Sequence, residues 1–149
     1  MVFREIERIE NKMIYERRIN YYETDAMQIV HHSNYIRFLE EARCRHLDQM
    51  GVPYKVFEEN GLLIPVMSAE LKFKSPAKYD DIIVIDMNIT EFTGVRMTVE
   101  YKVTLKGTDK IVLEAKTGHC FTDGKLKPIS LKKANKEIYD KIYNEFKRN

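Results

Sequence analysis

The sequence predicts an α+β domain in which a curved antiparallel sheet of about five strands wraps around one long helix, with a second helix near the C-terminus. Three observations predict this class. Apolar residues recur at helical spacing between residues 34 and 50. Four stretches between residues 63 and 121 alternate apolar and polar side chains, as half-buried strands do. Short turns join successive stretches, and strands joined in this way pair antiparallel.

The first twelve residues set no clear pattern and are compatible with a short helical turn or a tail. Residues 13–22 then alternate, and their β-branched and aromatic content indicates a strand. One face of this strand would carry Tyr15, Arg17, Ile19 and Tyr21. Residues 23–32 are expected to form a loop.

A helix is predicted from residue 34 to residue 50, about 25 Å long. Ser33 and Asn34 are good N-cap residues, and Gly51 followed by Pro53 marks the end. The predicted buried face consists of Tyr35, Phe38, Leu39, Ala42 and His46, widened by Ile36, Arg43, Leu47 and Met50. This helix is the natural cover for a sheet with one apolar face.

Strands are predicted at 63–75, 82–92, 95–105 and 111–121, after a possible helical turn at 54–60. In the first strand, Met67, Ala69, Leu71 and Phe73 would face inward, and Pro76 would end it. Ser130 would cap the terminal helix, about residues 130–147. We therefore expect residues 1–149 to form a single domain with its core at about 13–130, and we expect the sheet edges to pair with a second copy.

Composition narrows the function classes. Hydrophobic residues make up 44% and charged residues 32%, a globular balance. The net charge of +2 argues against nucleic acid as the main partner. Only two cysteines occur, which predicts no disulfide framework and suits a reducing cytoplasm. We expect no membrane span, because no apolar run approaches about 18 residues, and no signal peptide.

The loop before the long helix gathers chemistry-bearing residues: Asp25, His31 and His32. Asp25 has two open roles, a turn residue that caps its own backbone, or a general base or nucleophile aimed at a carbonyl. His32 is a candidate to fix substrate, orient water or shuttle a proton, with a solvated surface side chain as the alternative. Of the two histidines, His31 is the one expected to be a solvated surface residue without a role in the site. A backbone N–H at the helix start would suit an oxyanion.

Other sites are less well supported. Cys44, His46, His119 and Cys120 are of metal-ligand type but lack zinc-ligand spacing, so we expect no metal and interpret both cysteines as small buried residues. No GxSxG, GxGxxG or phosphate-binding glycine loop occurs, and no cofactor is expected. Four basic residues could meet phosphates or form a solvated strand face: Lys72, Lys74, Lys78 and Arg96.

Residues 22–35 (YETDAMQIVHHSNY) and 38–43 (FLEEAR) resemble the signature of the 4-hydroxybenzoyl-CoA thioesterase-like acyl-CoA thioesterases, which have the hotdog fold. Residues 74–81 (KSPAKYDD) resemble the segment between that family's second and third strands. The resemblance covers roughly residues 13–130. It implies that an acyl-CoA ester is hydrolysed to a free acid and coenzyme A.

The resemblance also implies roles for single residues. Asp25 matches the catalytic aspartate, which attacks the carbonyl or activates water. His32 matches the residue whose backbone amide polarises that carbonyl, and its side chain is a second participant. Most relatives carry glycine where this chain has Gln28, so the loop geometry and substrate choice are in question there.

Four residues are candidates for substrate binding: Gln28 through a polar contact, Tyr35 in an apolar pocket, and Lys74 and Arg96 at the phosphates. Met27, Val30, Phe38 and Met67 could line the same pocket, but each also suits the core, and the acyl group stays open. The family forms dimers, often paired into tetramers, with sites between protomers. A non-catalytic acyl-CoA-binding module is the alternative function, and the pattern of hotdog dehydratases and hydratases finds no match.

Overall fold

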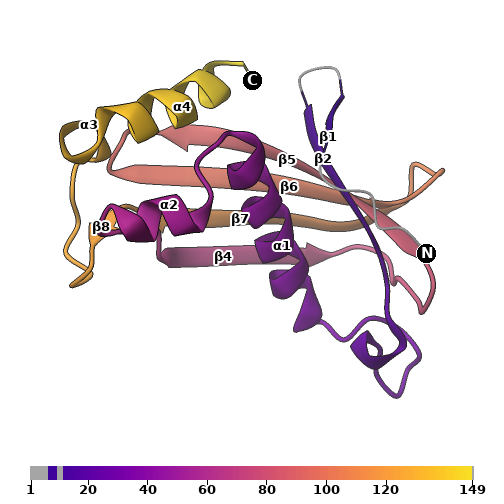
Figure 1. Ribbon diagram of the computed structural model, residues 1–149. Coiled ribbons are helices and arrows are strands. Elements are labelled where there is room, and N and C mark those ends of the chain that lie inside the picture. The colour runs from indigo at the N-terminus through magenta and orange to yellow at the C-terminus, as the bar shows by residue number, and fades with distance from the viewer. Residues whose placement is uncertain (1–6, 10–11, 149) are drawn as a thin grey trace.

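The computed structural model describes residues 7–9 and 12–148 (Figure 1). Part of the N-terminal stretch that the sequence left open is a short strand, β1 (Glu7–Ile9), which pairs antiparallel with β2 (Lys12–Arg18). The remainder of that stretch, residues 1–6, 10 and 11, lies outside the described residues. Across the described ranges, no helix is long and apolar enough to cross a membrane.

The main sheet is antiparallel and has the strand order β1-β2-β5-β6-β7-β4. Its long strands are β4 (Val66–Phe73), β5 (Ile82–Phe92), β6 (Arg96–Leu105) and β7 (Ile111–Cys120). The predicted pairing of consecutive strands is confirmed for β5, β6 and β7. By contrast, β4 pairs with β7 and not with the next strand along the chain. Two short strands, β3 (Leu62–Leu63) and β8 (Thr122–Asp123), form a separate pair.

Helix α1 (Asn34–Gln49) lies across one face of this sheet, followed by the shorter α2 (Tyr54–Glu59) (Figure 1). The helix bounds confirm the prediction from its apolar spacing. Its buried residues are Tyr35, Phe38, Leu39, Ala42, Arg43, His46 and Leu47. Ile36 was assigned wrongly to the buried face, since its side chain is 51% exposed. Apolar side chains of β5, β6 and β7 meet the helix and form one continuous core.

The edge strand β4 departs from its predicted burial. Met67 and Phe73, expected to face the core, are 66% and 55% exposed. The reason is topological, because β4 has a neighbour on one side only and lies beyond β7. A period of two predicts a strand, but it does not tell whether anything in the same chain covers its apolar face.

The C-terminal segment forms two helices where the sequence predicted one. They are α3 (Leu131–Ala134), with Ser130 as its N-cap, and α4 (Lys136–Lys147). Asn135 interrupts them with extended backbone, and its side-chain oxygen accepts a hydrogen bond from the Ile138 N–H at 3.1 Å. Asn135 thus ends one helix and caps the next. Helix α4 packs against β5, partly through Phe92 and Tyr139, whose ring centroids lie 5.2 Å apart.

Candidate active site

The loop that precedes α1 is a tight turn closed by backbone hydrogen bonds. The Asp25 N–H donates to the Ile29 carbonyl, and the Gln28 N–H donates to the Asp25 carbonyl, both at 2.9 Å. Gln28 has φ 65°, in the left-handed region that glycine adopts most readily. Glycine adopts this conformation without strain, which explains why the family resemblance implies glycine at the position that Gln28 occupies in this chain. Its side chain is exposed and does not line the cavity described below.

Asp25 presents one carboxylate oxygen to the turn and leaves the other open. Oδ1 accepts a hydrogen bond from the Met27 N–H at 2.8 Å. Oδ2 has no hydrogen-bond partner within the part of the chain that the structure describes. The turn-capping role is therefore present, and it leaves the second oxygen available to a ligand. The turn therefore fixes the orientation of this carboxylate through only one of its two oxygens.

Within the described part of the chain, a backbone N–H at the start of α1 has no acceptor. Ser33 occupies the N-cap position, but its side chain accepts no capping hydrogen bond. Instead, the Ser33 N–H donates to Nδ1 of His31 at 3.2 Å, and the Asn34 N–H donates to the His31 carbonyl at 2.9 Å. The His32 N–H finds no acceptor among the described residues. His31, expected to be the expendable histidine, thus organises the helix start.

The His32 side chain is exposed and held by ring contacts. It stacks on His31 with centroids 4.4 Å apart and meets Phe73 of β4 edge-on at 6.4 Å. The side chain therefore lies between the helix start and the sheet edge. A side chain in this position can contact a ligand inside the cavity and also the part of a ligand that extends into solvent.

A buried ionic network holds the loop against α1. Nη1 of Arg17 donates to Oε1 of Glu23, and Nε donates to Oε1 of Glu41, each at 2.8 Å. Burial lowers the pKa of Arg17, but the hydrogen bond with Glu23 and the two carboxylate charges outweigh it, so the pKa is raised. The Glu23 carbonyl in turn accepts from the His31 N–H at 2.9 Å and from the Asn34 side chain at 2.8 Å. Glu23 thereby connects the network directly to the helix start.

Sequence reasoning missed this network, although one signal was available. Asn20 and Glu23 have the three-residue spacing of a capping box, and Oε1 of Glu23 accepts a hydrogen bond from the Asn20 N–H at 2.7 Å. The prediction that Arg17 shares a face of its strand with Tyr15 is confirmed, and both residues are buried. Nothing local indicated that the partners of Arg17 would be Glu23 and a residue of the helix.

An open cavity of about 320 Å³ joins these elements. It is lined by Asp25, Met27, Ile29, Val30, His32, Tyr35, Phe73, Lys74, Ser75 and Pro76. Four of the predicted site residues therefore come together: Asp25, His32, Tyr35 and Lys74. Burial raises the pKa of Tyr35 to about 12, so this side chain forms a neutral wall. The volume lies at the lower end of the range for small-molecule sites.

Arg96 is not brought to this cavity. It lines a second open cavity with Met67 and Ser68 at the start of β4, while Lys74 follows the far end of that strand. The residues considered as metal ligands do not assemble either. Within the described ranges, no three His, Cys, Asp or Glu side chains form a metal-binding group. Cys44 and Cys120 are free thiols and only half-buried, so the interpretation of both as small buried residues was wrong.

Comparison with known proteins identifies the family. The model of the thioesterase-like superfamily matches residues 19–142. The chain belongs to this superfamily. It is 40% identical over 114 residues to a putative esterase of Aquifex aeolicus (strain VF5), covering 76% of this chain and 88% of the relative.

Two further comparisons agree with this family. A putative acyl-CoA thioesterase of Bacillus subtilis (strain 168) is 29% identical over 120 residues, which is 80% of this chain and 86% of the relative. The crystal structure of a DHNA-CoA thioesterase from Staphylococcus aureus superposes with a TM-score of 0.83 at 21% identity, covering 88% of each chain. At that identity the likeness concerns the fold, and it confirms the hotdog fold. The chain is a thioester hydrolase by class.

Proposed function

We propose that this thioesterase-like chain hydrolyses acyl-CoA thioesters at the cavity between Asp25 and the start of α1. One observation carries the proposal: Asp25 and His32 line the same cavity, and among the described residues Oδ2 of Asp25 and the His32 N–H have no hydrogen-bond partner. A carboxylate beside an unpaired amide suits a carbonyl that gains negative charge on oxygen. The Bacillus subtilis relative, named a putative acyl-CoA thioesterase, supports coenzyme A as the leaving group.

Two routes fit this arrangement. In the first, Asp25 attacks the thioester carbon, the His32 N–H stabilises the oxyanion, and coenzyme A leaves as a thiolate. Water then cleaves the resulting anhydride and regenerates the carboxylate. In the second, Asp25 takes a proton from a water molecule that attacks the same carbon. The coenzyme A thiolate takes its proton from the water molecule that cleaves the anhydride in the first route. In the second route the carbon–sulfur bond breaks and the thiolate takes the proton that Asp25 removed from water. The exposed His32 imidazole would relay this proton in either route.

Asp25→Asn tests the chemistry, because an asparagine oxygen still accepts the Met27 N–H and so preserves the turn. Free-thiol release from a panel of acyl-CoA esters should fall in kcat/KM by about 100-fold or more. Asp109→Asn, at an exposed position in the β6–β7 turn, is the matched control and should retain wild-type rates. Undiminished turnover by Asp25→Asn would exclude this mechanism. Coenzyme A binding without turnover of any ester would favour a non-catalytic binding module.

The substrate-binding roles follow from position. Lys74 borders the cavity and would meet a phosphate of coenzyme A, while Tyr35 would contact the acyl group. Gln28, exposed at the turn beside Asp25, would contribute a polar contact from the rim. Arg96 lies at another cavity and cannot join them within one chain in this arrangement.

A second copy would bring Arg96 to the site, and we propose that the chain is a homo-oligomer for this reason. The open edge of β4 carries Met67 and Phe73 in exposed positions. Antiparallel pairing of β4 with itself would set the start of one strand, beside Arg96, against the end of the other, beside Lys74. The site would then be completed between protomers, in a dimer or a dimer of dimers.

Complementation tests this arrangement. Asp25→Asn and Arg96→Met chains should each be impaired alone. Co-expressed chains should regain activity, because one site in each hybrid dimer would carry both native residues. Activity of the co-expressed sample no higher than the mean of the two variants would contradict a shared site. Sedimentation equilibrium would establish whether dimers or tetramers form. We also propose that residues 1–149 act as one domain, in the cytoplasm, which suits the two free cysteines.

A further inference from the structure

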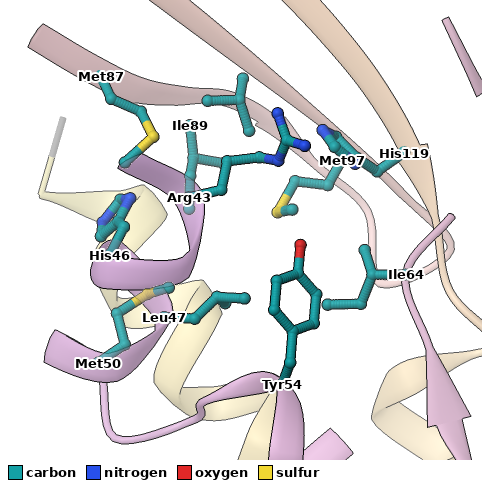
Figure 2. A pocket seen from close by; sticks show the side chains of 11 residues that line it. Arg43, His46, Leu47, Met50, Tyr54, Ile64, Met87, Ile89, Met97 and His119 are labelled. Atoms are coloured by element: carbon teal, nitrogen blue, oxygen red, sulfur yellow. The ribbon is translucent and has the colours of Figure 1, made fainter. Parts of the chain in front are cut away.

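Another cavity lies beneath the C-terminal half of α1 (Figure 2). It is lined by Arg43, His46, Leu47, Met50, Tyr54, Ile64, Met87, Ile89, Met97, Val99 and His119. None of these residues lines the Asp25 cavity. The centre of a water-sized sphere can occupy about 20 Å³ of this cavity, which leaves room for one small ligand. The thioesterase proposal makes no use of this space.

A chain of buried hydrogen bonds starts at Arg43. Its Nη1 lies 3.1 Å from the Tyr101 hydroxyl, which lies 2.7 Å from Oγ1 of Thr117, which lies 2.8 Å from Nε2 of His119. A guanidinium can only donate, so Tyr101 accepts from Arg43. The phenol proton then goes to Thr117, its one other partner among the described residues. The Thr117 proton goes in turn to Nε2 of His119.

The direction of this chain determines the tautomer of His119. Nε2 accepts, so the ring proton lies on Nδ1. Burial, followed by the charge of Arg43, lowers the pKa of His119 to about 4, and the ring is therefore neutral near pH 7. Nδ1 of His119 and Nε of Arg43 are both buried and without a partner in the described part of the chain. Two N–H groups without a partner among the described residues thus belong to side chains that line one cavity.

The charge of Arg43 also lacks a counterion. Its side chain is 7% exposed, and no carboxylate of residues 7–9 and 12–148 forms an ion pair with it. Burial raises the pKa of both Tyr101 and Tyr54, so neither phenol supplies a negative charge. The buried carboxylate of Glu145 contacts His46 at 3.4 Å and Arg148 at 3.8 Å. A buried cation of this kind is costly without a partner.

Figure 2 shows how these groups meet. Arg43 extends from α1 toward His119, and the Tyr54 hydroxyl points into the same space from the opposite side. The other lining side chains that the figure labels are apolar, apart from His46. A water molecule that accepts hydrogen bonds from both N–H groups would also need acceptors for its own two protons. The groups near this space that could accept them are a phenol oxygen and weakly accepting thioethers. A monatomic anion has no protons to place and neutralises the guanidinium.

We propose that this cavity binds one monovalent anion of chloride size, held by the Arg43 Nε–H and the His119 Nδ1–H. The anion would stabilise the contact between α1 and the sheet at a place separate from the catalytic loop. Binding of this kind acts through the folded state alone, since the unfolded chain does not assemble the two donors.

Crystals of the wild-type protein soaked in bromide test the proposal without any substitution. An anomalous peak in the cavity, in contact with Arg43 and His119, is expected. A cavity without anomalous signal, filled by water or empty, would overturn the proposal.

A thermal-unfolding titration tests the same site in solution. Chloride replaces gluconate at constant ionic strength, and the midpoint should rise by about 5–10 °C when chloride exceeds its Kd about 100-fold. Arg43→Met should abolish the rise. Arg37→Met, at an exposed position on the same helix, is the matched control and should retain it. A wild-type midpoint that does not respond to chloride would also overturn the proposal, whether or not the chain hydrolyses thioesters.

Discussion

Replacing Arg17 with methionine should weaken the fold at the point where the catalytic loop meets α1. The side chain of Arg17 is 6% exposed, and that of its partner Glu23 is 7% exposed. Methionine retains an apolar stem over Phe38, whose ring lies 3.9 Å below the guanidinium. The substitution therefore removes the charge and the hydrogen bonds while most of the packing stays.

The magnitude follows from what each carboxylate loses. Breaking a buried ion pair by removing one partner costs about 3–5 kcal/mol. Two features place Arg17→Met at the lower end of that range. Glu41 is 39% exposed and can be solvated, and Glu23 keeps its bond from the Asn20 N–H at 2.7 Å. We expect a loss of about 3 kcal/mol in the free energy of unfolding, or about 6–12 °C in the midpoint.

Urea and thermal unfolding measure this loss, with Arg18→Met as the control. Arg18 follows Arg17 in the chain and pairs with Asp80, but the two side chains are 25% and 56% exposed. An exposed pair contributes at most about 1 kcal/mol, so the control should change little. A double-mutant cycle with Glu23→Gln should show coupling of about 1–3 kcal/mol. An Arg17→Met protein within about 1 kcal/mol of wild type, or an additive cycle, would refute the reasoning.

Two further predictions concern backbone strain and pH. Gln28→Gly should raise the unfolding free energy by about 1 kcal/mol in urea titrations, because a left-handed φ of 65° disfavours a side chain; a loss of stability would show that the Gln28 side chain contributes contacts. For His119, a folded pKa of about 4 against about 6.5 unfolded means that the folded state binds fewer protons between those values. Stability should therefore be fully present above pH 6.5 and fall by about 3 kcal/mol toward pH 4. His119→Gln should lack that part of the decline, and parallel pH profiles for the two proteins would contradict the assignment.

Local patterns predicted the elements and much of the catalytic loop. The spacing of Phe38, Leu39 and Ala42 predicts α1, because a helix with a buried stripe must repeat at 3.6 residues. Alternation along β5 predicts its bounds for the same kind of reason. Asp25 and His32 could be selected because they are close in sequence on either side of one turn. Interactions of this range are encoded within a few residues of the chain.

Contacts between distant residues could not be predicted in this way. Glu41 lies 24 residues from Arg17, and Tyr101 lies 58 residues from Arg43. A side-chain pattern records which face is apolar, but it does not record which partner a buried charge will meet. The break at Asn135 and the role of His31 were missed for a related reason. Each depends on which of several possible hydrogen bonds the packed structure selects.

The sequence by itself therefore determined the class of fold, the position of α1 and the loop that carries Asp25, because periodicity and turn chemistry act locally. Only the tertiary structure decided that β4 is an edge strand and that, among the residues the structure describes, the His32 N–H has no acceptor and the buried Arg43 has no counterion. These properties depend on which strands become neighbours and on how completely the packed core excludes water. Both are consequences of long-range packing, which no single segment of the chain encodes.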